Sequence, residues 1–305
     1  MVGAKMTIHL SPGMAKAACL YAGVAFGLYW IPIRALNESG FSSLSAGIAL
    51  NAIPFAVIAP ILIYRWRHIF RNGIHFHLGA LLLGFAYALY VSAYAYTQIF
   101  NVILLFYLLP VWGFLLAWLV IGEALSSIRL LSLLLGMIGI GFVVGGSGPV
   151  GLFESIGDIM ALASGILWAV GSLLLLLDRQ GTATDCGFVF IAWSTLFLAG
   201  FSLIGGASEF AGPSLVDAAY EVLYWLVPVG LLLILPASLA TVIGPTILNP
   251  GVVGLLFMTE ISVGTVSAWL LSNEPVGLHQ LIAIVFITGA GILEPLLSFR
   301  RKARA

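Results

Sequence analysis

One glutamate, Glu260, stands in an otherwise uncharged stretch of the sequence, residues 252–271. An ionisable side chain inside hydrocarbon is costly and usually has a function. Counted from Asn249 and Pro250, about ten residues at about 1.5 Å each place Glu260 near the middle of a membrane-spanning helix. Helical geometry puts four further residues on the same face, namely Asn249, Phe257, Gly264 and Ser267. This face predicts a wet cavity where Glu260 binds a cation or exchanges a proton, although a protonated carboxyl that only bonds to a neighbouring helix would show the same pattern.

A second candidate surface is aromatic. Tyr87, Tyr90 and Tyr94 within residues 78–97, together with Gln98 just after them, share an arc of about 80° on a helix. Phenol rings offer flat apolar walls with hydrogen-bonding tips, which suits an aromatic or amphipathic solute. Tyr107 adds another phenol from the next apolar segment. The interpretation is a lining role, and ordinary packing of aromatic rings remains the alternative.

The elements that carry these residues must lie in a membrane. The composition is 61% hydrophobic and 8% charged, whereas soluble domains average about 25% charged residues. Ten apolar segments are long enough to cross a bilayer as helices: residues 17–33, 44–64, 78–97, 103–121, 130–146, 159–177, 189–206, 223–241, 252–271 and 281–297. Continuously apolar, Leu-rich runs favour helices over a barrel. The predicted fold class is therefore an all-α integral membrane protein with ten transmembrane helices.

Lysine and arginine set the expected orientation. With the N-terminus in the cytoplasm, eleven of the twelve Lys and Arg residues fall on the cytoplasmic side and Arg34 alone falls outside. Both termini are therefore expected in the cytoplasm. Arg34 has two interpretations, a lipid headgroup contact or a cation at the mouth of the cavity that meets a carboxylate.

Two short motifs occur twice and indicate a duplicated chain. Ala117-Trp118-Leu119 with Glu123 returns as Ala268-Trp269-Leu270 with Glu274, 151 residues later; Ala25-x-Gly27-x-x-Trp30 returns as Ala163-x-Gly165-x-x-Trp168, 138 residues later. We assign residues 1–147 and 148–305 to two repeats. Because each repeat holds five crossings, an odd number, the copies should be inverted, as in many secondary transporters. A tryptophan repeated near the twofold axis makes Trp30 and Trp168 candidates for the binding site.

Proline and glycine interrupt several of the expected helices. Pro110 and Gly113 lie in residues 103–121, Pro228 and Gly230 in residues 223–241, and Pro250 precedes residues 252–271. Such breaks persist in membranes where protein or a water-filled space satisfies the freed backbone groups. These five residues are the predicted hinges for alternating access.

The number, inversion and doubled motifs of these segments resemble the drug/metabolite transporter superfamily, and specifically its EamA-type repeats. Within it, the Tyr-rich third segment and Tyr29-Trp30-x-Pro32-x-Arg34 look most similar to bacterial aromatic amino acid exporters. The resemblance implies a central cavity and export of a small metabolite across the bacterial inner membrane. Two departures matter. Pro110 aligns with Ile261, so hinge roles cannot be transferred from one repeat to the other. Glu260 aligns with Leu109, so any charge chemistry belongs to one repeat.

Other functions fit the residues less well. An intramembrane enzyme needs a catalytic pair or a metal motif at membrane depth, and the segments contain neither. We expect no enzyme activity, cofactor, metal or nucleic-acid partner. The expected partners are the lipid bilayer, an amino acid solute and, as a candidate, protons; the sequence leaves monomer and homodimer open. The main alternative is a broad exporter of drugs and lipophilic cations, because a glutamate among aromatic rings also suits a cation.

Overall fold

The computed structural model describes residues 11–97, 99–145, 153–178, 180–204, 215–272 and 277–302. Every regular element in these ranges is helical. The first half contains α1 (Pro12–Gly27), α2 (Trp30–Glu38), α3 (Ser43–Ile69), α4 (Ile74–Ala93), α5 (Ile99–Phe106), α6 (Leu109–Leu116), the π-helical turn η1 (Ala117–Ile121) and α7 (Ser127–Gly145). The second half contains α8 (Ile156–Leu177), α9 (Ala183–Ile204), α10 (Leu215–Val229), the π-helical turn η3 (Gly230–Ile234), α11 (Leu235–Ile243), α12 (Pro250–Phe257), α13 (Thr259–Ser272) and α14 (Leu278–Lys302). The all-helical prediction is thus confirmed for the described residues.

Length and composition make this a multi-pass membrane protein. Among the described residues, eight helical stretches are long and apolar enough to cross a bilayer: Pro12–Glu38, Leu44–Ile69, Ile74–Ala93, Asn101–Ile121, Ile156–Leu177, Ala183–Leu203, Tyr220–Ile243 and Pro250–Leu271. Two shorter apolar helices, Ser127–Phe142 and Leu281–Gly291, coincide with the other two predicted segments. The count of ten crossings and the inversion of the repeats stay predictions. The predicted repeat boundary at residues 147 and 148, Gln98 and Glu274 lie outside the described residues.

Short polar side chains start two helices that matter for the site. Ser155 and Asp158 cap the start of α8 reciprocally, each side chain accepting a backbone N–H near the other. Asn249 caps α12 by accepting the N–H of Gly251, and Pro250 is the first residue of that helix. A proline at this position lacks an N–H that would have no helical partner anyway. Pro250 therefore begins a helix and does not bend one.

Two spans are interrupted at matching positions. α5 gives way to α6 at Tyr107 and Leu108, and α12 gives way to α13 at Met258. Tyr107 and Met258 are 151 residues apart, the same spacing as the repeated Ala-Trp-Leu motif. The same interruption at the same register in both halves is what a duplicated chain would show.

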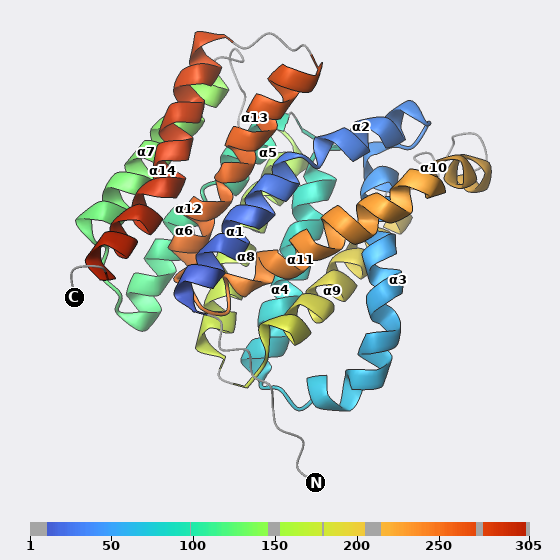
Figure 1. Cartoon of the computed structure of the whole chain (residues 1–305), viewed down its shortest axis with the longest axis horizontal. Helices are drawn as coiled ribbons and strands as arrows, with labels where there is room; N and C mark the ends of the chain where they lie inside the picture. The colour runs from blue at the N-terminus through green and yellow to red at the C-terminus, as the bar shows by residue number, and fades with distance from the viewer. Residues whose placement is uncertain are drawn as a thin grey trace.

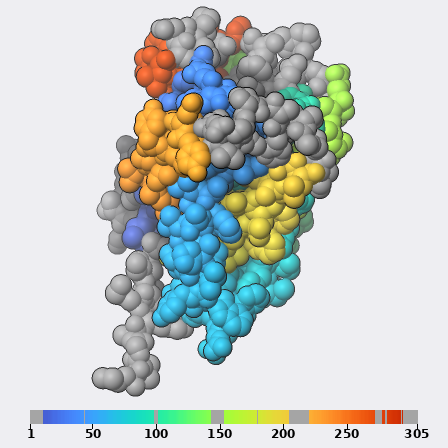
Figure 2. Space-filling model, turned by 90° about the vertical axis from the view of Figure 1, so that its right-hand side faces the viewer, coloured from blue at the N-terminus to red at the C-terminus, as the bar shows by residue number. Residues whose placement is uncertain are grey.

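Helices of the first half pack against helices of the second half (Figure 1). α4 packs against α8 and α9, α1 runs beside α13 and also contacts α11, and α7 pairs with α14 at the left edge of the view. Figure 2 shows the opposite edge, where α3, α9 and α10 form the surface. The helices that carry the predicted site, α4 and α13, therefore face the interior from opposite halves of the chain.

The two interrupted spans cross with their backbones in contact. A Cβ atom at Gly113 of α6 would lie 2.6 Å from the carbonyl carbon of Pro250, and one at Gly254 of α12 would lie 2.9 Å from the ring of Pro110. Both distances are shorter than real Cβ contacts, so only glycine allows this approach. The crossing fixes the two halves against each other beside the breaks.

Candidate functional site

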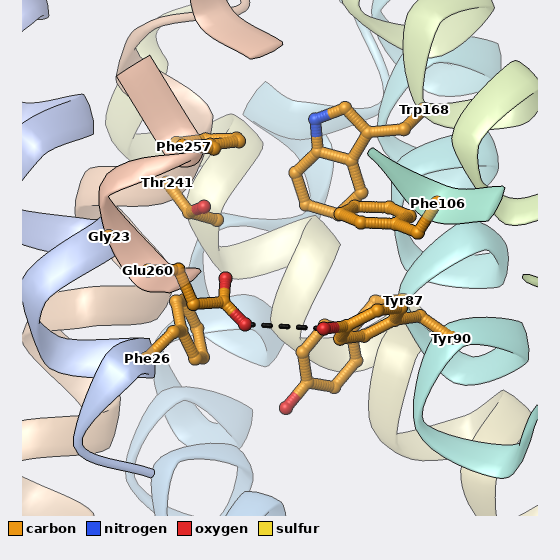
Figure 3. Close-up of a pocket in the computed structure, with 9 residues that line it drawn as sticks. All are labelled: Gly23, Phe26, Tyr87, Tyr90, Phe106, Trp168, Thr241, Phe257 and Glu260. Atoms are coloured by element: carbon orange, nitrogen blue, oxygen red, sulfur yellow. Dashed lines mark hydrogen bonds between the residues drawn. The ribbon is translucent and has the colours of Figure 1, made fainter. Parts of the chain in front are cut away.

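A small cavity lies next to the two helix breaks (Figure 3). Its walls come from both halves of the chain: Gly23, Phe26, Tyr87, Tyr90, Phe106, Trp168, Thr241, Phe257 and Glu260. Its volume is about 40 Å³, and a single water needs about 10–15 Å³ measured in this way. The cavity therefore has room for a few waters, and an amino acid would need it to widen.

The carboxyl group of Glu260 accepts hydrogen bonds at both oxygens. The hydroxyl of Tyr90 donates to Oε1 at 3.3 Å, and that of Tyr107 donates to Oε2 at 2.8 Å. Tyr94 supports this pair from behind, because its hydroxyl donates to the hydroxyl of Tyr90 at 2.7 Å. Figure 3 shows the Glu260 carboxyl directed across the cavity toward Tyr90. An oxygen pair held by two phenols suits an anion that is ready to meet a positively charged group.

The break at Met258 explains the local setting of Glu260. Because α13 starts at Thr259, Glu260 lies in its first turn. Backbone N–H groups in the first turn of a helix have no partner within that helix, and the helix dipole favours a negative charge there. Gly23 and Gly27 on α1 let this turn approach closely. A Cβ atom at Gly23 would lie 3.3 Å from the backbone nitrogen of Glu260, and one at Gly27 would lie 2.8 Å from its backbone carbonyl oxygen. The backbone of Glu260 is thus held by α1.

Gly165, the counterpart of Gly27 in the second Ala-x-Gly-x-x-Trp motif, also allows a close backbone contact. A Cβ atom at Gly165 of α8 would lie 2.7 Å from the carbonyl oxygen of Phe106, the last residue of α5. Gly27 meets the broken span of the second half, and Gly165 meets the broken span of the first. The doubled Ala-x-Gly-x-x-Trp motif therefore marks where one half packs against the interrupted helix of the other.

Aromatic rings form the rest of the wall. The rings of Tyr90 and Phe106 have centroids 4.4 Å apart. Trp168 is 4% exposed and meets Phe106, Phe190 and Phe257 edge to face, with centroid distances of 6.3, 5.9 and 5.9 Å. Such contacts add about 0.5–1.5 kcal/mol each beyond area burial. The rings therefore make a mostly apolar enclosure around one acidic group.

Asn51 on α3 is a polar site residue that the sequence analysis did not single out. Asn51 is 2% exposed. Its side-chain nitrogen carries two hydrogens and lies within hydrogen-bond distance of three oxygens: the hydroxyl of Tyr29 at 3.3 Å, the hydroxyl of Tyr87 at 3.2 Å and the carbonyl of Gly47 at 2.8 Å. This network fixes the phenol of Tyr87 in the cavity wall. A lone asparagine in the apolar run of residues 44–64 was the available signal.

The structure places three predicted site residues away from this cavity. The indole nitrogen of Trp30 donates to Ser267 Oγ at 2.9 Å, and Trp30 lines a separate groove of α2 and α13 together with Arg34. Arg34 pairs with Glu38 one turn on, at 3.6 Å. Asn249 was predicted to share a cavity face with Glu260, but it does not line this cavity. The prediction assumed one continuous helix, and the break at Met258 interrupts that helix.

Asn249 instead belongs to a polar group at the end of η1. Its amide donates to Glu123 Oε2 at 2.6 Å, and Arg129 binds the other oxygen of Glu123. Partial burial opposes the charge, but these hydrogen bonds outweigh it and lower the pKa of Glu123 below its ordinary value. This group ties the first half to the start of α12.

The predicted hinges occupy different local settings. Pro228 lies inside α10, and Gly230 begins the π-helical turn η3, so the helix ladder is disturbed there. Pro110 lies in the first turn of α6, just after the break, and Gly113 lies at the crossing with α12. Their movement in alternating access stays a prediction.

Two further acids are fully buried near helix ends. Asp185 in the first turn of α9 accepts Arg65 Nε at 2.9 Å, and His68 lies 3.5 Å away. Asp158 accepts the hydroxyl of Thr97 at 2.6 Å. Both acids have donors around them, so they serve as connections between helices. Within the described ranges, no three His, Cys, Asp or Glu side chains gather where they could hold a metal.

Comparison with known proteins identifies part of this architecture. Residues 14–145 match the EamA-like transporter family. The first half of the chain carries an EamA-like domain. No curated protein matches the chain in sequence at a significant level. Among 29 matching chains of solved structures, one described as a crystal structure of a protein aligns with a TM-score of 0.69 and 20% identity, covering 94% of this chain and 98% of that chain. This likeness shows that the fold extends beyond the EamA-like domain over nearly the whole length.

Proposed function

We propose that the protein is a secondary transporter of the drug/metabolite superfamily that exports amino acids with aromatic or large apolar side chains. The observation that carries the proposal is the Glu260 carboxyl, held by two phenols in an aromatic cavity between the two halves of the chain. The EamA-like domain supports the transporter class, and the multi-pass helical fold supplies the membrane setting. The resemblance to bacterial aromatic amino acid exporters, of which YddG is one, supports the substrate class.

The chemistry of the cavity matches the proposed solute. An α-ammonium group would meet the Glu260 carboxylate, while the side chain would lie against Tyr87, Tyr90 and Trp168. Because the cavity holds about 40 Å³, solute entry requires a conformational change. The breaks at Tyr107 and Met258, and the π-helical turn at Gly230, are the proposed places for it.

The proposed location is the bacterial inner membrane, with both termini in the cytoplasm. Figure 1 supports this orientation, since the start of α1, the end of α3 and the end of α14 point toward the same side of the molecule. These ends carry most of the Lys and Arg residues, and Arg34 belongs to α2 on the other side. Reporter fusions after Ser147 and at Ala305 should report opposite sides; the same side would refute the topology.

The charges of the cavity lining also support a second candidate function, export of lipophilic cations. The residues that line the described cavity include one acid and no Lys, Arg or His, which also suits a lipophilic cation without a carboxylate. Purified protein in liposomes distinguishes the two functions when it is offered phenylalanine, tryptophan, threonine and a cationic dye. Transport of the dye with no transport of any amino acid would establish the drug exporter instead.

The role of Glu260 is tested in the same liposomes. Glu260→Gln keeps the size and one of the two acceptor oxygens but removes the charge, so transport should fall at least tenfold while the protein remains folded. Glu38→Gln is the matched control, because Glu38 is exposed and lies outside the cavity; it should transport like the wild type. Wild-type rates for Glu260→Gln at every pH and with every solute would remove Glu260 from the mechanism.

A further inference from the structure

The indole N–H of Trp168 is a buried donor without an acceptor. Trp168 is 4% exposed, and within the described part of the chain its Nε1 has no hydrogen-bond partner. Buried polar groups are normally paired, because an unpaired donor loses its bonds to water without compensation. Trp168 also lines the cavity, and Figure 3 shows its nitrogen on the ring edge turned toward Phe257 and Thr241. The unpaired donor is therefore a feature of the binding site.

The immediate neighbours do not satisfy this donor. Phe257 meets Trp168 edge to face at 5.9 Å and 76°, and an aromatic face is a weak acceptor. The hydroxyl of Thr241 lines the same cavity without bonding to Nε1. The other two rings in contact with the indole, Phe106 in the cavity wall and Phe190 outside it, offer no side-chain oxygen.

The duplicated tryptophan provides an internal comparison. Trp30 occupies the equivalent place in the first Ala-x-Gly-x-x-Trp motif, and its indole N–H is satisfied by Ser267 Oγ at 2.9 Å. The same residue in the same motif is thus paired in one half and left open at the cavity in the other. Trp30 is only half-buried, and within the described residues the indole N–H of Trp112 also has no partner, although Trp112 does not line this cavity. Trp168 differs from both because its unpaired N–H belongs to a residue of the cavity wall.

We infer that Trp168 Nε1–H forms an acceptor subsite that binds the carboxylate of the solute, while Glu260 binds its ammonium group. The inference rests on the proposed function and adds a specific requirement: the ligand must carry a hydrogen-bond acceptor in addition to a positive charge. Glu260 on α13 and Trp168 on α8 lie on different walls of the cavity, so the two ends of a zwitterion would be held by different helices (Figure 3). A simple amine can satisfy Glu260 alone.

Three probes with the same ring and ammonium group separate these requirements. Phenylalanine carries a carboxylate, phenylalaninamide a neutral acceptor and 2-phenylethylamine neither. In wild-type proteoliposomes, competition against labelled phenylalanine should rank them in that order, with phenylethylamine at least tenfold weaker than phenylalanine. In Trp168→Phe, which keeps an aromatic ring, phenylalanine should weaken about tenfold while phenylethylamine changes less than twofold.

Two controls make the result decisive. Trp30→Phe removes the paired indole outside the cavity and should keep the wild-type ranking. The wild-type ranking itself needs no variant, so it remains informative if Trp168→Phe does not fold. Equal binding of all three probes, or an unchanged ranking in folded Trp168→Phe, would mean that water alone meets this N–H, and the subsite would be refuted while transport stands. If none of the probes binds to the wild type, the proposed function itself fails.

Discussion

The backbone contact between α6 and α12 gives the sharpest stability prediction, through the change Gly113→Ala. The added methyl group would lie 2.6 Å from the carbonyl carbon of Pro250, while ordinary contact begins at 3.4 Å. The α12 backbone must therefore move by almost 1 Å. It cannot yield as a flexible side chain would, because Asn249 and Glu123 hold the start of α12 in place.

The expected magnitude follows from overpacking. Inserting a methyl group into a packed interior costs about 1–3 kcal/mol, and a rigid backbone neighbour places Gly113→Ala toward the upper end. For chains of 150–250 residues, each kcal/mol shifts the melting temperature by about 2–4 °C. Thermal unfolding in detergent should thus show a decrease of roughly 5–10 °C.

A matched control separates packing from helix propensity. A Cβ atom at Gly141 of α7 meets nothing within 4 Å, and alanine is favoured over glycine in a helix by about 1 kcal/mol. Gly141→Ala should therefore be neutral or slightly stabilising. If Gly113→Ala melts at the wild-type temperature or above it, the close crossing of α6 and α12 is refuted.

Three further predictions, one of them with a matched control, test the polar contacts. Tyr107→Phe removes the shorter hydrogen bond to the Glu260 carboxyl; because a bond to a charged group contributes about 1.5–3 kcal/mol, transport in liposomes should fall at least tenfold. Tyr94→Phe is the control, since Tyr94 bonds to Tyr90 and not to Glu260, and it should change transport about twofold. Equal losses in the two variants would contradict the geometry. Asp185→Asn should lower the melting temperature because it breaks the ion pair with Arg65. Breaking a fully buried pair costs about 3–5 kcal/mol, and the cost should be smaller here because the Arg65 side chain is 39% exposed. An unchanged melting temperature would show that this ion pair does not stabilise the fold. Because folding lowers the pKa of Glu123, the carboxylate adds stability that is complete above its ordinary pKa of 4.5 and is lost as the pH falls below that value. The stability difference between wild type and Glu123→Gln should therefore shrink between neutral pH and pH values near 3. A constant difference would contradict this linkage.

Helical periodicity made much of the site accessible from the sequence. Tyr87 and Tyr90 are three residues apart on one apolar span, so they must share a face. Glu260 stood out because a carboxyl in a bilayer needs partners. The structure brings these three residues and Trp168 to one cavity. Patterns confined to one helix, or to one charge in an apolar span, thus indicated residues that lie at the same cavity, and their binding of a solute stays a prediction.

Relations between helices were harder to predict. The face drawn through Asn249 assumed a continuous helix, and the break at Met258 separates Asn249 from Glu260. Asn51 is important because of two phenols on other helices, which its own span does not reveal. Symmetry suggested equal roles for Trp30 and Trp168, yet their neighbours differ. Such outcomes depend on packing partners that one sequence does not specify.

The unpaired indole of Trp168 implies a conflict between stability and activity. A buried donor without an acceptor destabilises the empty protein by about 1–3 kcal/mol. Selection for stability alone would favour an oxygen beside it, as Ser267 stands beside Trp30. Directed evolution for heat resistance should therefore favour substitutions that place an acceptor beside the indole nitrogen. Under the proposed subsite, the resulting proteins would unfold at a higher temperature and bind the solute more weakly.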